Sequence, residues 1–188
     1  DPGGRTTAFT YDVMGRRTEV DAPDTLDADG NTLTNITTTI YDAAGQVTET
    51  SGDQTYRTTN TYDALGRQAT MTTYGTETAT TTWSYDAQRG FLTRKEYNDG
   101  KGTDYTYTAA GRLATRTWAR GVVTSYSYDA GMLVLTDYSD TTPDVSVSYD
   151  NFGRLVTQSN DLATSTFAYD ASTLQLDTET IAYDLDTD

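Results

Sequence analysis

Large apolar and small polar residues alternate along this chain with a period of two, and each alternating run ends at a tyrosine. Two residues before that tyrosine stand, in chain order, Phe9, Thr39, Asn60, Trp83, Tyr105, Tyr126, Val147, Phe167 and Ile181. The residue directly before it is Thr, Ser or Ala in every copy except Ile40. Side chains of a β-strand point alternately to opposite faces, so the pattern predicts strands with one aromatic face and one small, hydroxyl-rich face.

The tyrosine is followed by aspartate in all but one copy, and the pair recurs at nearly even intervals. The repeat tyrosines stand at positions 11, 41, 62, 85, 107, 128, 149, 169 and 183, which gives spacings of 30, 21, 23, 22, 21, 21, 20 and 14 residues. A core period of about 21 residues is typical of stacked repeat architectures. The long first interval contains an Asp- and Thr-rich stretch, which we interpret as a surface insertion at residues 21–35.

Each pair opens a motif, Tyr-Asp-x-x-Gly-Arg, that is typical of a turn. Asp can accept a hydrogen bond from the backbone two residues on, and Gly takes a positive φ without a Cβ clash. We therefore predict a β-hairpin in every unit, with Tyr ending one strand and Arg beginning the next. The motif residues to which we assign this structural role are Tyr11, Asp12, Gly15, Arg16, Tyr41, Asp42, Gly45, Tyr62, Asp63, Gly66, Arg67, Tyr85, Asp86, Tyr107, Gly111, Arg112, Tyr128, Asp129, Tyr149, Asp150, Gly153, Arg154, Tyr169 and Asp170.

A second apolar column follows the turns. Val47, Leu92, Leu113, Leu133, Leu155 and Leu176 recur at nearly the same place, and Arg17 and Gln68 interrupt the series. We expect this column to share the tyrosine face. The sequence therefore predicts an all-β protein of tandem antiparallel hairpins, a single array over residues 1–188 that forms a continuous curved strip and buries a continuous core between its units.

Composition excludes several kinds of chemistry. The chain has 13 basic and 28 acidic residues, a formal net charge of −15, and neither His nor Cys. Disulfides, Cys/His zinc sites and mechanisms that need a His base or a Cys nucleophile are excluded. The charge argues against nucleic acid, and no apolar run is long enough to insert into a membrane. Absence of Cys fits an extracellular protein, and we expect no cofactor.

Three sets of residues are candidate sites. The tyrosine column could stack on sugar rings, although a cross-strand ladder is the favoured interpretation. The motif Asp residues could be metal ligands or catalytic acids, but they stand where a turn needs an acceptor, and a site repeated in every unit is unusual for an enzyme. Asp27, Asp29 and Asn31 have the alternating oxygen ligands of a short calcium loop, although the full pattern of an EF-hand is incomplete. We expect no enzymatic activity.

The tandem Tyr-Asp-x-x-Gly-Arg units resemble the YD repeats of RHS proteins, over nearly the whole chain from Thr6 to Asp184. In that family, arrays of such hairpins form a β-strip that spirals into a hollow shell, as in RHS polymorphic toxins, the cocoon components of insecticidal toxin complexes and teneurin barrels. The resemblance implies a structural segment of a secreted or cell-surface protein whose shell encloses a toxin payload.

A closed shell of this family is several times longer than 188 residues, so we expect this chain to supply part of a wall and to come from a longer protein. Its expected partners are neighbouring repeats of that parent chain, or identical copies joined through open edge strands into a filament. A third possibility is a carbohydrate-binding or adhesion surface on the aromatic face, with a glycan as partner.

Overall fold

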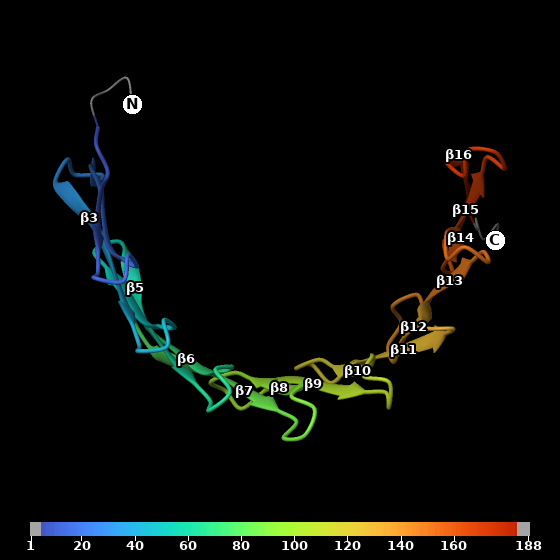
Figure 1. Ribbon diagram of the computed structural model, residues 1–188, viewed down its shortest axis with the longest axis horizontal. Coiled ribbons are helices and arrows are strands. Elements are labelled where there is room, and N and C mark those ends of the chain that lie inside the picture. The colour runs from blue at the N-terminus through green and yellow to red at the C-terminus, as the bar shows by residue number, and fades with distance from the viewer. Residues whose placement is uncertain (1–4, 184–188) are drawn as a thin grey trace. The chain divides into compact units, whose positions relative to one another are not determined.

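The computed structural model describes residues 5–183, which form β-strands and no helix (Figure 1). No helix that could cross a membrane is present in these residues. The chain divides into two compact units, residues 1–101 and 102–188. The first unit contains β1 (Ala8–Tyr11), β2 (Arg17–Leu26), β3 (Thr32–Tyr41), β4 (Val47–Gly52), β5 (Thr55–Tyr62), β6 (Gln68–Tyr74), β7 (Thr78–Tyr85) and β8 (Leu92–Glu96). The second contains β9 (Gly102–Tyr107), β10 (Leu113–Thr117), β11 (Val123–Asp129), β12 (Met132–Tyr138), β13 (Val145–Tyr149), β14 (Leu155–Ser159), β15 (Ala163–Tyr169) and β16 (Leu176–Tyr183).

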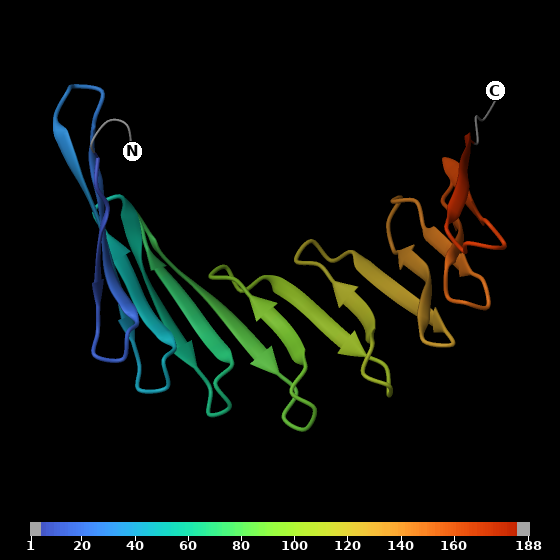
Figure 2. The ribbon, with the colours of Figure 1, turned by 45° about the horizontal axis from the view of Figure 1, so that its top comes forward.

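Within each unit the strands follow one another in chain order, and each is antiparallel to the next (Figure 2). The prediction of an all-β array of tandem hairpins is confirmed. The stretch at residues 21–35 lies in the outer half of the β2–β3 hairpin, whose two strands are ten residues each. A turn at residues 27–31 connects them.

The motif turns form short hairpin loops. In the first, the amide of Gly15 donates to the carbonyl of Asp12 at 3.0 Å, and Gly15 has a φ of 77°. The amide of Asp12 donates to the carbonyl of Arg16 at 2.9 Å, which closes a three-residue loop with a glycine bulge. Because the carbonyl of Arg16 closes the loop, the return strand begins at Arg17, one residue later than predicted. The turns that begin at Asp42, Asp63, Thr108 and Asp150 repeat these two bonds.

Three motif turns depart from this length. The loops that begin at Asp86 and Asp170 are one residue longer, and in them Gly90 and Leu174 adopt the positive φ, at 75° and 61°. The turn after β11 is shorter, with positive φ at both Ala130 and Gly131, as in the two-residue hairpin turns that match strand twist. The motif thus tolerates different loop lengths while the flanking strands stay paired.

Leu174 is the one large side chain among residues 5–183 at a positive φ, and half of it is exposed. A left-handed conformation costs an L-residue roughly 1–2 kcal/mol, and glycine avoids this cost. Part of the gain is lost because glycine has more conformational freedom in the unfolded chain. We therefore expect Leu174→Gly to raise the free energy of unfolding by about 1 kcal/mol, measured by urea denaturation. Leu162→Gly, at an exposed leucine with ordinary φ, should lower it. Equal signs for the two variants would contradict this account.

Strand register places the second apolar column directly opposite the repeat tyrosines, which confirms that the two share a face. The opposed pairs are Tyr41 with Val47, Tyr85 with Leu92, Tyr107 with Leu113, Tyr128 with Leu133, Tyr149 with Leu155 and Tyr169 with Leu176. Arg17 and Gln68 occupy the same place opposite Tyr11 and Tyr62. The other face carries hydroxyl pairs, such as Thr61 with Thr70 and Ser148 with Thr157, whose oxygens are 2.6 Å apart.

The expected continuous core does not form in residues 5–183. No apolar side chain there is fully buried, and the fully buried polar side chains are Thr103 and Thr124. The reason is that the strands of each unit form one sheet, and no second layer of residues covers either face of it (Figure 1). A side chain is then covered by its neighbours on the same face while its outer side stays accessible. The sheet must be held together by strand pairing and by contacts between neighbouring hairpins.

Candidate functional site

The motif aspartate is bound within its own turn. One carboxylate oxygen of Asp63 accepts the amides of Leu65 and Arg67, each at 2.9 Å. The other accepts Nε of Arg67 at 2.7 Å and lies 2.6 Å from its Nη2. The pairs Asp12–Arg16 and Asp150–Arg154 repeat this arrangement. A carboxylate that accepts bonds on both oxygens from its own turn is poorly placed to hold a metal or to transfer a proton.

These bonds shift the titration of the carboxylates. The side-chain and backbone hydrogen bonds of Arg67 lower the pKa of Asp63 from its ordinary value, and the backbone bonds of Arg16 and Arg154 do most to lower the pKa of Asp12 and Asp150. Backbone amides likewise lower the pKa of Asp86 and Asp170. The ionised form is therefore the form that the folded turn binds.

The lowered pKa values predict acid destabilisation. A group whose pKa is depressed by folding contributes stability above its unfolded pKa, near 3.9 for Asp, and loses it as the pH falls through the folded value. The chain has no His or Cys, so we expect the free energy of unfolding to be nearly constant from about pH 6 to 8 and to fall below about pH 4. Urea titrations at a series of pH values measure it. The double variant Asp63→Asn, Asp150→Asn should lose less stability on acidification, and an unchanged acid loss would contradict the role of these carboxylates.

The residue after the motif glycine connects each hairpin to the next one. Arg16 donates Nη1 to the carbonyl of Asp42 at 3.0 Å, and Arg67 and Arg154 reach the carbonyls of Gly90 and Leu174 at 3.3 and 3.2 Å. Each of the three guanidinium groups also lies over the ring of the next repeat tyrosine. The distances from Cζ to the ring centroid are 4.8 Å for Arg16 with Tyr41, 4.2 Å for Arg67 with Tyr85 and 4.3 Å for Arg154 with Tyr169. The arginine side chain therefore joins two hairpins, through a cation–π contact with the tyrosine ring and a charge-assisted hydrogen bond to the backbone carbonyl.

The tyrosine hydroxyl completes this joint from the other side. It donates to the carbonyl of the first residue of the preceding return strand, at 2.8 or 2.9 Å. The pairs are Tyr41 with Arg17, Tyr62 with Val47, Tyr85 with Gln68, Tyr128 with Leu113 and Tyr169 with Leu155. Partial burial raises the pKa of Tyr85, Tyr107 and Tyr126. We name these contacts between consecutive hairpins the repeat joint. It comprises the contacts of the Arg or Gln with the next hairpin and the hydrogen bond of the tyrosine hydroxyl to the preceding one.

The remaining motif residues follow the same plan with substitutions. Gln46 stands in the Arg position and donates its side-chain Nε2 to the carbonyl of Gly66 at 2.7 Å. Its backbone amide donates to the carboxylate of Asp42. Thr108 stands in the Asp position, where its hydroxyl accepts the amide of Arg112 at 3.1 Å. The guanidinium of Arg112 lies 5.7 Å from the ring centroid of Tyr128. Sequence reasoning assigned these residues to turns but did not predict their reach across the joint, which depends on the register of the next hairpin.

The calcium candidate occupies a turn of the same kind. One oxygen of Asp27 accepts the amides of Asp29 and Asn31 at 2.9 and 2.8 Å, and the other accepts the side-chain amide of Asn31 at 2.9 Å. The side-chain and backbone bonds of Asn31 lower the pKa of Asp27. Residues 5–183 contain no cluster of three or more acidic side chains that could hold a metal ion. Calcium binding here stays a prediction.

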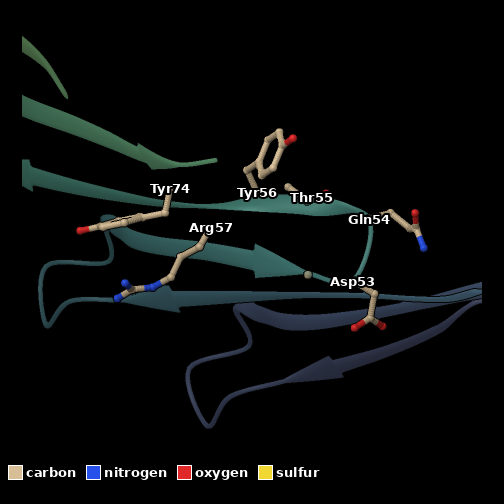
Figure 3. Close-up of a pocket in the computed structure, with 7 residues that line it drawn as sticks. Asp53, Gln54, Thr55, Tyr56, Arg57 and Tyr74 are labelled. Atoms are coloured by element: carbon tan, nitrogen blue, oxygen red, sulfur yellow. The ribbon is translucent and has the colours of Figure 1, made fainter. Parts of the chain in front are cut away.

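A shallow hollow lies at the tip of the β4–β5 hairpin, between the turn that joins these two strands and Tyr74 (Figure 3). Its polar side chains bond to the sheet: Asp53 accepts the amide of Ile36, and Gln54 donates to the carbonyl of Thr34. Arg57 pairs with Glu49 at 2.7 Å and lies over the ring of Tyr74. The hollow therefore presents one largely exposed ring, that of Tyr56, and sequence reasoning missed it because these residues lie outside the repeat column.

Comparison with known families agrees with this geometry. The family model described as RHS Repeat matches residues 1–26, which contain the first motif. The first 26 residues of the chain are therefore similar to an RHS repeat. Four further motif turns along the chain have the same two backbone bonds as the turn of that motif. The repeating unit of this chain is one hairpin with its motif turn, joined to the next by the repeat joint. A comparison with curated proteins found no significant match.

Solved structures with a similar run of strands include two of toxin complexes. The Tc holotoxin pore of Photorhabdus luminescens superposes with a TM-score of 0.48 at 16% identity, over 97% of this chain, and a TcdB2-TccC3-Cdc42 crystal structure superposes with a TM-score of 0.47 at 16% identity, over 94% of this chain. This chain spans 13% of the length of each toxin chain. A porin-like protein from Bacteroides uniformis superposes with a TM-score of 0.43 at 15% identity, over 95% of this chain and 89% of its own.

Proposed function

We propose that this chain is a non-catalytic wall segment of an RHS-type shell, which encloses a toxin payload in a secreted or surface-exposed protein. The observation that carries the proposal is the use of the motif side chains. The recurring Asp, Arg and Tyr residues bond to their own turn or to the adjacent hairpin. Recurring residues that make these bonds hold consecutive hairpins together in one continuous sheet.

The two chemically different faces support a wall. One face carries the tyrosine and leucine columns, and the other carries rows of Thr and Ser whose hydroxyls bond to each other across the strands. No second layer covers either face in residues 5–183. A single sheet with distinct faces suits a boundary between two compartments, and its continuity through the repeat joint allows a wall to be extended by further hairpins.

The carboxylates support the absence of catalysis. Hydrolysis by paired carboxylates needs one acid with a raised pKa beside an ionised partner in a cleft. The shifted Asp and Glu side chains of residues 5–183 all have lowered pKa values, each from bonds to neighbouring groups of the sheet. We therefore assign to this segment the binding of neighbouring repeats and no reaction.

The proposal is tested on the complete product of the natural reading frame. We expect hollow particles in negative-stain images. We also expect the enclosed payload segment to resist protease in the intact particle and to be degraded once the particle is opened with denaturant. Solid particles, or equal digestion of all segments before and after opening, would overturn it. A payload sequence fused to the C-terminus of that product and still protected from protease would add direct support.

A further inference from the structure

We propose that the aromatic face of the second unit binds a polypeptide segment that carries a carboxylate among apolar side chains, and that Arg116 is the cation that holds this carboxylate. The site is a row of side chains across β9 to β12. It belongs to one face of this chain, so binding there does not depend on the proposed shell.

Strand register places Arg116 in the middle of the row. Arg116 of β10 lies opposite Tyr105 of β9 on one side and opposite Thr124 of β11 on the other. Thr124 in turn lies opposite Tyr138 of β12. Directly opposed residues of an antiparallel sheet point to the same face. Just after the end of β10, the ring centroid of Trp118 lies 3.5 Å from Cζ of Arg116, and Nε1 of Trp118 donates to the hydroxyl of Thr124 at 2.9 Å. The guanidinium is therefore stacked on a ring that is itself fixed to the sheet.

The charge of Arg116 has no anionic partner in residues 5–183. Its Nε is buried without a hydrogen-bond partner, and its Nη atoms make no ion pair or hydrogen bond with the described part of the chain. Strand arginines on the hydroxyl-rich face differ, because Arg57 pairs with Glu49 at 2.7 Å and Arg94 with Glu96 at 2.8 Å. A partly buried cation without an anion is costly, and an arriving carboxylate that binds the terminal nitrogens offsets part of that cost.

The acidic side chains of the same strands lie on the opposite face. They are Asp104, Asp129 and Asp137. Each is next in sequence to a tyrosine of the aromatic face, so its side chain points away from that face. Residues 105–128 contain three arginines and no Asp or Glu, and Thr108 replaces the aspartate that stands in this place in most other motifs. The aromatic face of these strands is therefore locally positive, although the net charge of the chain is −15.

Tyrosine hydroxyls beside Arg116 are also available to a ligand. The hydroxyls of Tyr105, Tyr126 and Tyr138 make no hydrogen bond within residues 5–183, whereas those of five repeat tyrosines bond to carbonyls of the sheet. Partial burial raises the pKa of Tyr126, and the nearby charge of Arg116 opposes that rise. A carboxylate bound to Arg116 can accept a further bond from such a hydroxyl.

The open shape of the site favours a polypeptide as the occupant. No apolar side chain of this face is fully buried in the described residues, and a small molecule lying on it would not be enclosed as ligands in pockets are. An acidic polysaccharide has charges on successive sugars and needs a series of cations, but Arg116 is the one basic residue of β9 to β12. An isolated carboxylate between apolar side chains matches one guanidinium between tyrosine and leucine columns.

Titration of the 188-residue protein with two probe peptides tests the site. One is a short acetylated and amidated peptide with glutamates spaced among leucines and serines, and the other has glutamine in place of each glutamate. Nitrogen–proton correlation spectra follow the Nε–H signal of Arg116, which is assigned from its loss in Arg116→Gln. We expect the glutamate peptide to bind about fivefold more tightly than the glutamine peptide and to shift this signal. Equal affinities, or an unmoved signal, would overturn the proposal without any need for a variant.

Two substitutions locate the preference for glutamate on the sheet. Arg116→Gln should reduce the affinity for the glutamate peptide to that for the glutamine peptide, because it removes the charge and the paired donors. Arg120→Gln is the matched control, since this arginine lies in the same unit 3.4 Å from Asp140, and the preference should stay unchanged. Far-ultraviolet circular dichroism checks that both variants are folded. Equal effects of the two substitutions, or tighter binding of a polyuronate than of the glutamate peptide, would overturn the assignment.

Discussion

Replacing Gly52 by alanine should unfold the β3–β4 pairing and lower the free energy of unfolding by about 2–3 kcal/mol. Gly52 ends β4 opposite Thr37. A Cβ there would collide with the carbonyl oxygen of Ile36 and lie 3.1 Å from the Cα of Thr37. Both are backbone atoms of the adjacent strand, so neither can turn aside as a side chain can. The same carbonyl accepts the amide of Asp53 at 3.0 Å, and its displacement breaks that bond as well. Urea denaturation followed by far-ultraviolet circular dichroism measures the loss.

The control for this substitution is Gly75→Ala, at another hairpin end. A Cβ on Gly75 would lie 3.7 Å from its nearest neighbours, the ring of Tyr56 and the carbonyl of Glu77, which is ordinary van der Waals contact. Neither glycine has a positive φ, so the two variants differ mainly in the room beside the backbone. We expect Gly75→Ala to change stability by less than about 0.5 kcal/mol. Similar losses in the two variants would show that close strand approach at Gly52 is not the cause.

Strands, faces and turns could be predicted from the sequence because their signals are local. An alternation of period two places Tyr62 and Asn60 on one face and Thr61 on the other whatever the rest of the chain does. An Asp-x-x-Gly segment specifies its turn through bonds among five consecutive residues. The register then brought Leu113 and Leu155 opposite their tyrosines without any further requirement.

The buried core could not be predicted correctly, because alternation looks the same whether the aromatic face is covered by a second layer or stays open. Only the spatial arrangement shows that Tyr41 and Val47 are covered from the sides and not from above. The motif arginines were expected to pair with carboxylates of their own turn or of the neighbouring unit, but the backbone carbonyls and rings that they contact in the next hairpin were not predicted, for a related reason. The carbonyl that Arg16 binds belongs to Asp42, and the 30-residue interval between the two tyrosines hides this proximity until the β2–β3 hairpin is folded back.

Removing a joint arginine should have the second large effect. Arg67 donates to the carbonyl of Gly90 and lies 4.2 Å from the ring centroid of Tyr85, and about a quarter of its side chain is exposed. We expect Arg67→Ala to lower the free energy of unfolding by about 2 kcal/mol from the lost ring and carbonyl contacts. Urea denaturation measures the total.

The chain itself supplies the matched control for this variant. Gln46 stands in the same position of another motif and still reaches the next turn, with Nε2 2.7 Å from the carbonyl of Gly66. Arg67→Gln should therefore keep the bond to Gly90 while it loses the contact with the ring of Tyr85 and the charge beside Asp63, and its destabilisation should be about half that of Arg67→Ala. Amide hydrogen exchange adds a local test, because loss of the joint should raise exchange in β7 and β8 more than in β3 and β4. If Arg67→Gln were as unstable as Arg67→Ala, the ion pair and ring contact would account for the whole effect and the bond across the joint for none of it.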